Sequence, residues 1–72
     1  MLWEEEVARL RQGEYEQRVW QVFSILQRHR SGLREQEIAE MLGWHRRSVN
    51  NYLHELEDQN RAYREGWLWF AE

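Results

Sequence analysis

The sequence predicts a mainly α-helical domain that ends in a small β-hairpin. Three observations predict this fold class: apolar residues recur at helical spacing, glycines separate the helical stretches, and residues 61–70 read as two short strands around a turn. Seventy-two residues make one domain. A domain this small buries only about 60% of its unfolded surface, so its five Trp, three Tyr and two Phe matter for the core.

The composition narrows the class of protein. Without Cys, the chain has no disulfide framework and no thiolate metal site. No run of 18 apolar residues is present, so we expect no membrane span. The acidic start MLWEEEVARL differs from a basic signal peptide, which indicates a cytoplasmic protein. From residue 17 onwards, eight Arg face eight acids. This balance argues against a strongly basic nucleic-acid surface.

The segment before Gly13 is expected to be a short, separate helix. Its apolar residues recur at helical spacing: Trp3, Val7 and Leu10. This stripe needs a cover, either the rest of the chain or a second copy. We therefore divide the chain into residues 1–13, an accessory or dimerising helix, and residues 14–72, the main domain.

The first core helix is predicted from Glu14 to about His29. Its apolar stripe follows an amphipathic pattern: Tyr15, Val19, Val22, Phe23 and Leu26. Trp20 and Ile25 widen the stripe. We expect a core this small not to bury Trp20 completely. Ser31 and Gly32 end the helix.

A second core helix is predicted from about Arg34 to Leu42. Leu33 before it fits a short extended piece, and Gly43 fits a left-handed helix end. No Ser or Thr cap marks its start. Four residues are expected to face inward: Ile38, Ala39, Met41 and Leu42.

The third core helix is predicted from about His45 to Gln59, and Asn60 fits its left-handed stop. One face is apolar: Val49, Tyr52, Leu53 and Leu56. Residues 61–70 then form a hairpin. With Glu65 and Gly66 as its loop, Ala62 lies opposite Trp69 and Tyr63 opposite Leu68.

Two helices joined by a turn of about three residues that contains Gly make a helix-turn-helix. The trailing hairpin makes it winged. The predicted fold is thus a winged helix-turn-helix, with a three-helix core, a two-stranded wing and an extra N-terminal helix.

The stretch SGLREQEIAEMLGWHRRSVNNYLHELEDQN resembles the winged helix-turn-helix domain of bacterial transcription regulators. The resemblance covers about residues 17–72, and these residues match: Gly32, Leu33, Glu37, Ile38, Ala39, Leu42, Gly43, Ser48, Val49, Leu53 and Leu56. It implies a module that binds double-stranded DNA with its third helix in the major groove.

The chain departs from this family's pattern at several places. Arg34 replaces the usual Ser or Thr cap, Trp44 and His45 replace a small aliphatic residue and Ser, and Asn60 replaces Gly. The wing lacks a basic loop. The third helix is also faintly similar to domains that bind Z-form nucleic acids, but His54 stands where those have Tyr, and their Pro-rich wing is absent.

Candidate DNA contacts lie on the polar face of the third helix. A helical wheel places Arg47, Asn50, Asn51 and His54 opposite the apolar face, flanked by Arg46 and Ser48. Arg pairs with guanine and Asn with adenine, and recognition helices read bases with their N-terminal residues. The first two turns of this helix contain no acid. The competing interpretation is that this is an ordinary solvated helix face. Arg61 and Arg64 on the wing are candidate phosphate contacts, and the same alternative, simple solvation, applies to them.

No catalytic constellation, metal site or cofactor site is expected. His29, His45 and His54 have no metal-ligand spacing with carboxylates, and no glycine-rich phosphate loop is present. We therefore expect a protein that is not an enzyme. Trp44, Trp67 and Trp69 are interpreted as core or hairpin packing, with base stacking as the alternative.

Two functional hypotheses follow. The first is a DNA-binding module of a transcription regulator. This module can form a homodimer through Trp3, Val7 and Leu10. The second is a winged-helix domain for protein–protein contact, which the neutral core, the acidic N-terminus and the aromatic richness favour. Either module can be part of a larger chain.

Overall fold

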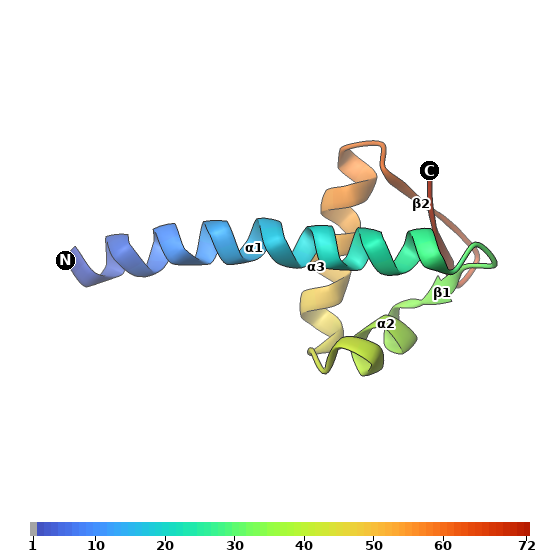
Figure 1. Cartoon of the computed structure of the whole chain (residues 1–72), viewed down its shortest axis with the longest axis horizontal. Helices are drawn as coiled ribbons and strands as arrows, with labels where there is room; N and C mark the ends of the chain where they lie inside the picture. The colour runs from blue at the N-terminus through green and yellow to red at the C-terminus, as the bar shows by residue number, and fades with distance from the viewer. Residues whose placement is uncertain (1) are drawn as a thin grey trace.

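The computed structural model describes the backbone of residues 2–72 and the side chains of residues 13–72. Within this part the chain forms three helices and a three-stranded antiparallel sheet (Figure 1). In chain order the elements are α1 (Leu2–Arg28), β1 (Leu33–Arg34), α2 (Glu35–Leu42), α3 (Arg46–Asp58), β2 (Ala62–Glu65) and β3 (Leu68–Ala71). The predicted fold class, mainly helical with a small wing, is confirmed.

The expected helix break at Gly13 is wrong, because α1 runs without interruption from Leu2 to Arg28. A Gly inside a helix costs only about 1 kcal/mol relative to Ala. Directly after it, Arg18 pairs with Glu14 one helical turn away, with 2.6 Å between Nη2 and Oε1. The N-terminal half of α1 therefore extends beyond the rest of the domain (Figure 1). The side chains of Trp3, Val7 and Leu10 lie outside the described residues.

One hydrophobic core lies between the second half of α1, the other two helices and the sheet. The buried residues are Val19, Val22, Phe23, Leu26, Leu33, Ile38, Ala39, Val49, Tyr52, Leu53, Leu56, Ala62 and Trp69. All four residues predicted to face inward from α3 are among them. Met41 was predicted inward but is 50% exposed. It lies about a third of a turn away from the stripe that Ile38, Ala39 and Leu42 define.

The hairpin forms with a register different from the predicted one. Gly66 and Trp67 make the loop, so Glu65 pairs with Leu68 and Ala62 with Ala71. Gly66 takes a φ of 60° at the first loop position, which is cheap for Gly alone. Pairing partners shift by two residues, so the side-chain alternation is kept and Ala62 and Trp69 still share the core face.

The sheet has a third member that ties the hairpin to the helices. β1 pairs with β3, so the strand order is β1-β3-β2. Leu33, which the sequence placed in a short extended piece, pairs with Trp69. This pairing fixes the wing, defined as β2, β3 and their loop, beside the start of α2.

Local stop signals place α3 as predicted. Gly43 ends α2 with a φ of 70°, and Asn60 follows α3 with a φ of 59°. α2 begins at Glu35 rather than Arg34, whose backbone N–H donates to the Glu37 carboxylate at 2.8 Å. The turn between Gly43 and α3 gives the chain its helix-turn-helix.

Aromatic contacts hold α1 across α3. Tyr15 meets Tyr52 edge to face, with 5.2 Å between ring centroids, and its hydroxyl donates to Glu55 at 3.4 Å. Burial, and then the Glu55 carboxylate, raise the pKa of Tyr15. Trp44 also meets Tyr52, and the Arg18 guanidinium lies 5.0 Å from the Trp44 ring. These contacts cover one flank of α3 and leave the opposite flank to the wing.

Candidate nucleic-acid interface

The outward row of α3 carries two unpartnered polar side chains. Arg47 and Asn51 lie one helical turn apart, and both are exposed. Among residues 13–72, neither side chain makes a hydrogen bond or ion pair. Both are therefore available to a ligand in front of the helix. Ser48, also predicted as a contact, is half-buried.

The row of α3 that faces the wing is already engaged by a carboxylate. Glu35, the first residue of α2, accepts a hydrogen bond from Asn50 Nδ2 at 2.5 Å. The same carboxylate pairs with Arg46 Nε at 3.1 Å. The first two turns of α3 contain no acid in sequence, but the fold brings one onto them. This contact joins residues 15 positions apart, and no sequence pattern indicated it.

His54 also faces the wing. Its Nδ1 lies 3.1 Å from a Glu57 oxygen, and its ring meets Trp69 edge to face at 5.6 Å. Arg64 lies over the same Trp69 ring, also at 5.6 Å. Trp69 thus positions one predicted contact from α3 and one from the wing.

A groove of about 420 Å³ lies between the start of α2, the first half of α3 and the wing tip. It is lined by Arg34, Glu35, Gln36, Arg46, Asn50, Arg64, Gly66, Trp67 and Trp69. Three guanidinium groups face one carboxylate there, which leaves a local excess of positive charge. The chain as a whole has a formal net charge of −3. The groove is therefore suited to an anionic partner, which the overall charge did not indicate.

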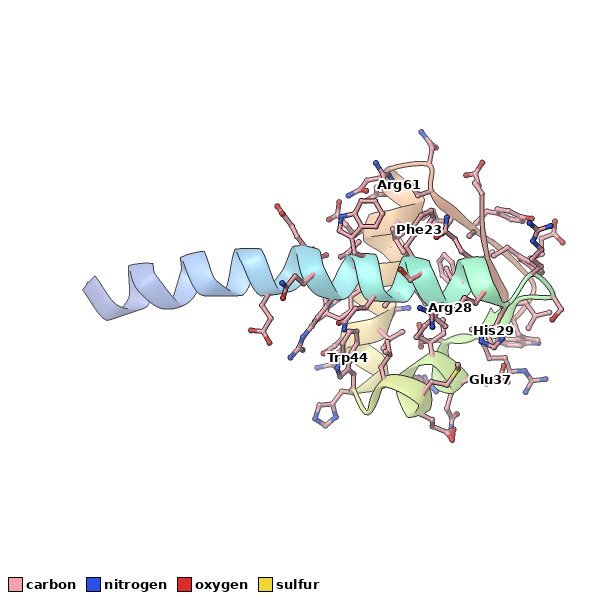
Figure 2. The ribbon with its side chains drawn as sticks, viewed as in Figure 1. Phe23, Arg28, His29, Glu37, Trp44 and Arg61 are labelled. Carbon is pink, nitrogen blue, oxygen red and sulfur yellow. The ribbon has the colours of Figure 1, made fainter. Side chains whose placement is uncertain are left out.

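Arg61 is not brought to this groove. Its guanidinium lies 5.0 Å from the ring of Trp20 on α1. Figure 2 shows Arg61 near one end of α3 and Trp44 near the other. Arg61 and the first turn of α3 therefore belong to different parts of the surface.

The three tryptophans near the site differ in environment. Trp69 is 2% exposed and Trp44 is half-buried against the core, so the packing interpretation is right for both. It is wrong for Trp67, which is 83% exposed at the wing tip.

The described residues hold no group of three His, Cys, Asp or Glu side chains placed to bind a metal ion. In the same part of the chain, no helix is long and apolar enough to cross a membrane.

Replacing Glu35 by Gln is expected to tighten binding to duplex DNA of arbitrary sequence. The change removes a negative charge from the groove and releases Arg46 for a phosphate. One added phosphate contact steepens the plot of log K against log salt by about 0.9. Fluorescence anisotropy at several salt concentrations measures both quantities.

Glu40→Gln is the matched control, because it makes the same charge change on an exposed part of α2 that does not line the groove. Equal effects of the two substitutions would show that net charge alone is responsible.

Comparison with protein families finds a match to a helix-turn-helix family. A family model described as a homeodomain-like domain covers residues 16–67, from the second half of α1 to the wing tip. Comparisons with curated proteins and with solved structures give no match. The matched region covers more than half of the chain and contains the helix-turn-helix, so the chain belongs to the homeodomain-like helix-turn-helix family.

Proposed function

We propose that this chain is the double-stranded DNA-binding module of a transcription regulator. The observation that carries the proposal is the pair Arg47 and Asn51, exposed and unpartnered on the first half of α3. The family match favours DNA binding in general. Regulation of transcription, the bacterial type of regulator and a cytoplasmic location are parts of the proposal.

In the proposed complex, α3 enters the major groove with its N-terminal half. We propose that Arg47 pairs with guanine and Asn51 with adenine, since these side chains match the donor and acceptor patterns of those bases. Arg46 and Asn50 contribute once DNA competes with Glu35 for them. Ser48 and His54 flank this set.

Phosphate contacts are proposed for the wing side of the interface. Arg64 lies over Trp69 and lines the groove, as does Arg34 at the start of α2. Both guanidiniums are thereby held near the first half of α3. Arg61 lies apart, beside Trp20, so we propose an interface without it.

NMR titration of labelled protein with duplex DNA tests the proposal. Amide shifts confined to residues 34–36, 45–54 and 62–67 are expected. An absence of shifts at low salt contradicts DNA binding, because phosphate contacts are strongest there.

Protein–protein contact is the second candidate function. The observation that favours it is Trp20, which is 55% exposed on α1, a helix that extends beyond the domain. Trp20 suits a protein partner because aromatic side chains are enriched in protein–protein interfaces. In this case the titration described above leaves the α3 amides unchanged, and the chain serves as one domain of a larger assembly or protein.

A homodimer through α1 is compatible with either function. The sequence stripe of Trp3, Val7 and Leu10 can fold back on its own domain only if the helix ends near Gly13, and α1 is continuous there. We therefore propose that a second copy covers the stripe. A two-fold dimer also suits a palindromic DNA site.

Trp3→Ala is expected to lower the apparent mass at micromolar concentration, because it removes the largest apolar group of the proposed interface. Analytical ultracentrifugation measures the mass. A wild-type chain that sediments as a monomer at high concentration excludes the dimer. Loss of stability at unchanged mass would instead indicate packing within one chain.

A further inference from the structure

Trp67 occupies an unusual place for a large aromatic side chain. It is the second residue of a two-residue loop and is 83% exposed, more than any other large hydrophobic residue among those whose burial is described. An indole in water loses the favourable free energy that burial of its apolar surface gives. Packing within this domain therefore does not account for Trp67.

The two-residue loop of the wing, Gly66 and Trp67, has no charged side chain with which to hold a phosphate backbone. Arg64 is followed directly by Glu65, and Gly66 and Trp67 complete the loop. Arg64 itself lies over Trp69 rather than at the tip. The tip therefore presents mainly a flat aromatic surface.

The surroundings of Trp67 favour a nucleic acid as its occupant. Trp67 borders the groove that Arg34, Arg46 and Arg64 line. An aromatic platform beside several guanidiniums matches a base that lies between phosphates, because the ring stacks on the base and the cations neutralise the backbone. A neutral apolar protein surface would not need the three guanidinium groups that line the groove beside Trp67.

We propose that Trp67 stacks on a DNA base beside the segment that α3 reads, so that the wing acts as an aromatic wedge. The proposal rests on the proposed DNA binding and adds the chemistry of the wing contact. Apolar side chains that enter the base stack partly unstack one step and bend the duplex. The guanidinium groups that line the groove hold the backbone next to that step.

Trp20 provides a matched control for Trp67. It is also an exposed Trp, with the Arg61 guanidinium 5.0 Å from its ring, but it lies on α1 and does not line the groove. A general effect of removing an exposed indole appears in both alanine variants. A stacking contact on DNA appears only in Trp67→Ala.

The experiment uses a duplex that the wild-type chain selects from a randomised DNA library. Affinity is measured for wild type, Trp67→Ala, Trp67→Phe and Trp20→Ala. Trp67→Ala is expected to bind about 5- to 150-fold more weakly, the range for loss of one base–aromatic stack. Trp67→Phe retains a ring and is expected to lie between Trp67→Ala and wild type. Trp20→Ala is expected to match wild type.

Opening of the base stack by the wedge is read by placing 2-aminopurine at successive positions of the selected duplex. Its fluorescence rises when it is unstacked from its neighbours. Wild type is expected to raise the signal at one step, and Trp67→Ala is expected to abolish this rise. Thermal melting of Trp67→Ala serves as the check on folding. Because Trp67 is 83% exposed, its replacement is expected to leave the melting temperature unchanged.

Two results overturn the inference while leaving DNA binding intact: equal affinities of wild type and Trp67→Ala, or no rise in fluorescence at any step with wild type. Equal losses in Trp67→Ala and Trp20→Ala also overturn it. If the wild-type chain selects no duplex at all, the proposed function fails together with the inference.

Discussion

Replacement of Arg47 by Ala is expected to weaken binding to the preferred DNA sequence by about 1–3 kcal/mol, or about 5- to 150-fold. Arg47 is exposed on the outward row of α3, and no carboxylate among residues 13–72 competes for its guanidinium. A bidentate pair with guanine would be lost entirely. We expect preference to relax at one base position while binding to other sequences changes little. Competition assays with single-base variants of the preferred duplex measure this effect.

Arg64→Ala is the comparison variant for Arg47→Ala. It removes the same charge from the wing, where we propose a phosphate contact. Binding to all sequences is expected to weaken alike, and the salt dependence is expected to flatten. Equal, sequence-independent losses for the two variants would mean that Arg47 contacts only a phosphate.

Replacement of Leu53 by Ala is expected to lower the free energy of unfolding by about 2–5 kcal/mol. Leu53 is fully buried and anchors α3 from the side opposite Arg47 and Asn51. The loss combines the transfer free energy of the removed carbons with the cavity left behind. A single core of this size rarely contributes more than about 3–5 kcal/mol of net stability. Urea denaturation followed by circular dichroism is expected to show a largely unfolded chain.

Met41→Ala is the control for Leu53→Ala, because Met41 is apolar but 50% exposed on α2. Its effect is expected to stay within about 0.5 kcal/mol, as for ordinary surface positions. A volume-conserving Leu53→Met change is expected to cost less than about 1.5 kcal/mol. A stable Leu53→Ala variant would contradict the full burial of Leu53 in the core.

Helical spacing in the sequence predicted the three core helices, and stop signals predicted where α2 and α3 end. Helical spacing predicted all four residues that α3 buries, because burial of one face imposes a period of 3.6 residues on the chain. Gly43 and Asn60 marked the helix ends because few residues tolerate a left-handed backbone. These signals are local, so neighbouring residues are enough to read them.

The sequence was ambiguous wherever two local preferences competed. Gly13 can end a helix or continue it at a cost of about 1 kcal/mol, and in α1 it continues. Gly66 fits either of two adjacent hairpin loops. The structure has the loop at Gly66 and Trp67, together with the pairing of Leu33 and Trp69 across the sheet, a contact between distant parts of the chain.

Contacts between elements, which the sequence did not indicate, assemble the candidate site. Glu35 contacts Arg46 and Asn50. Arg61 lies beside Trp20, and Trp67 is exposed at the wing tip. Residue spacing in the sequence indicates none of these arrangements, because each depends on how α1, α2 and the wing pack around α3. The physical reason is that residue spacing reports which face of an element is buried, whereas electrostatic contacts between elements depend on distances that the fold alone sets.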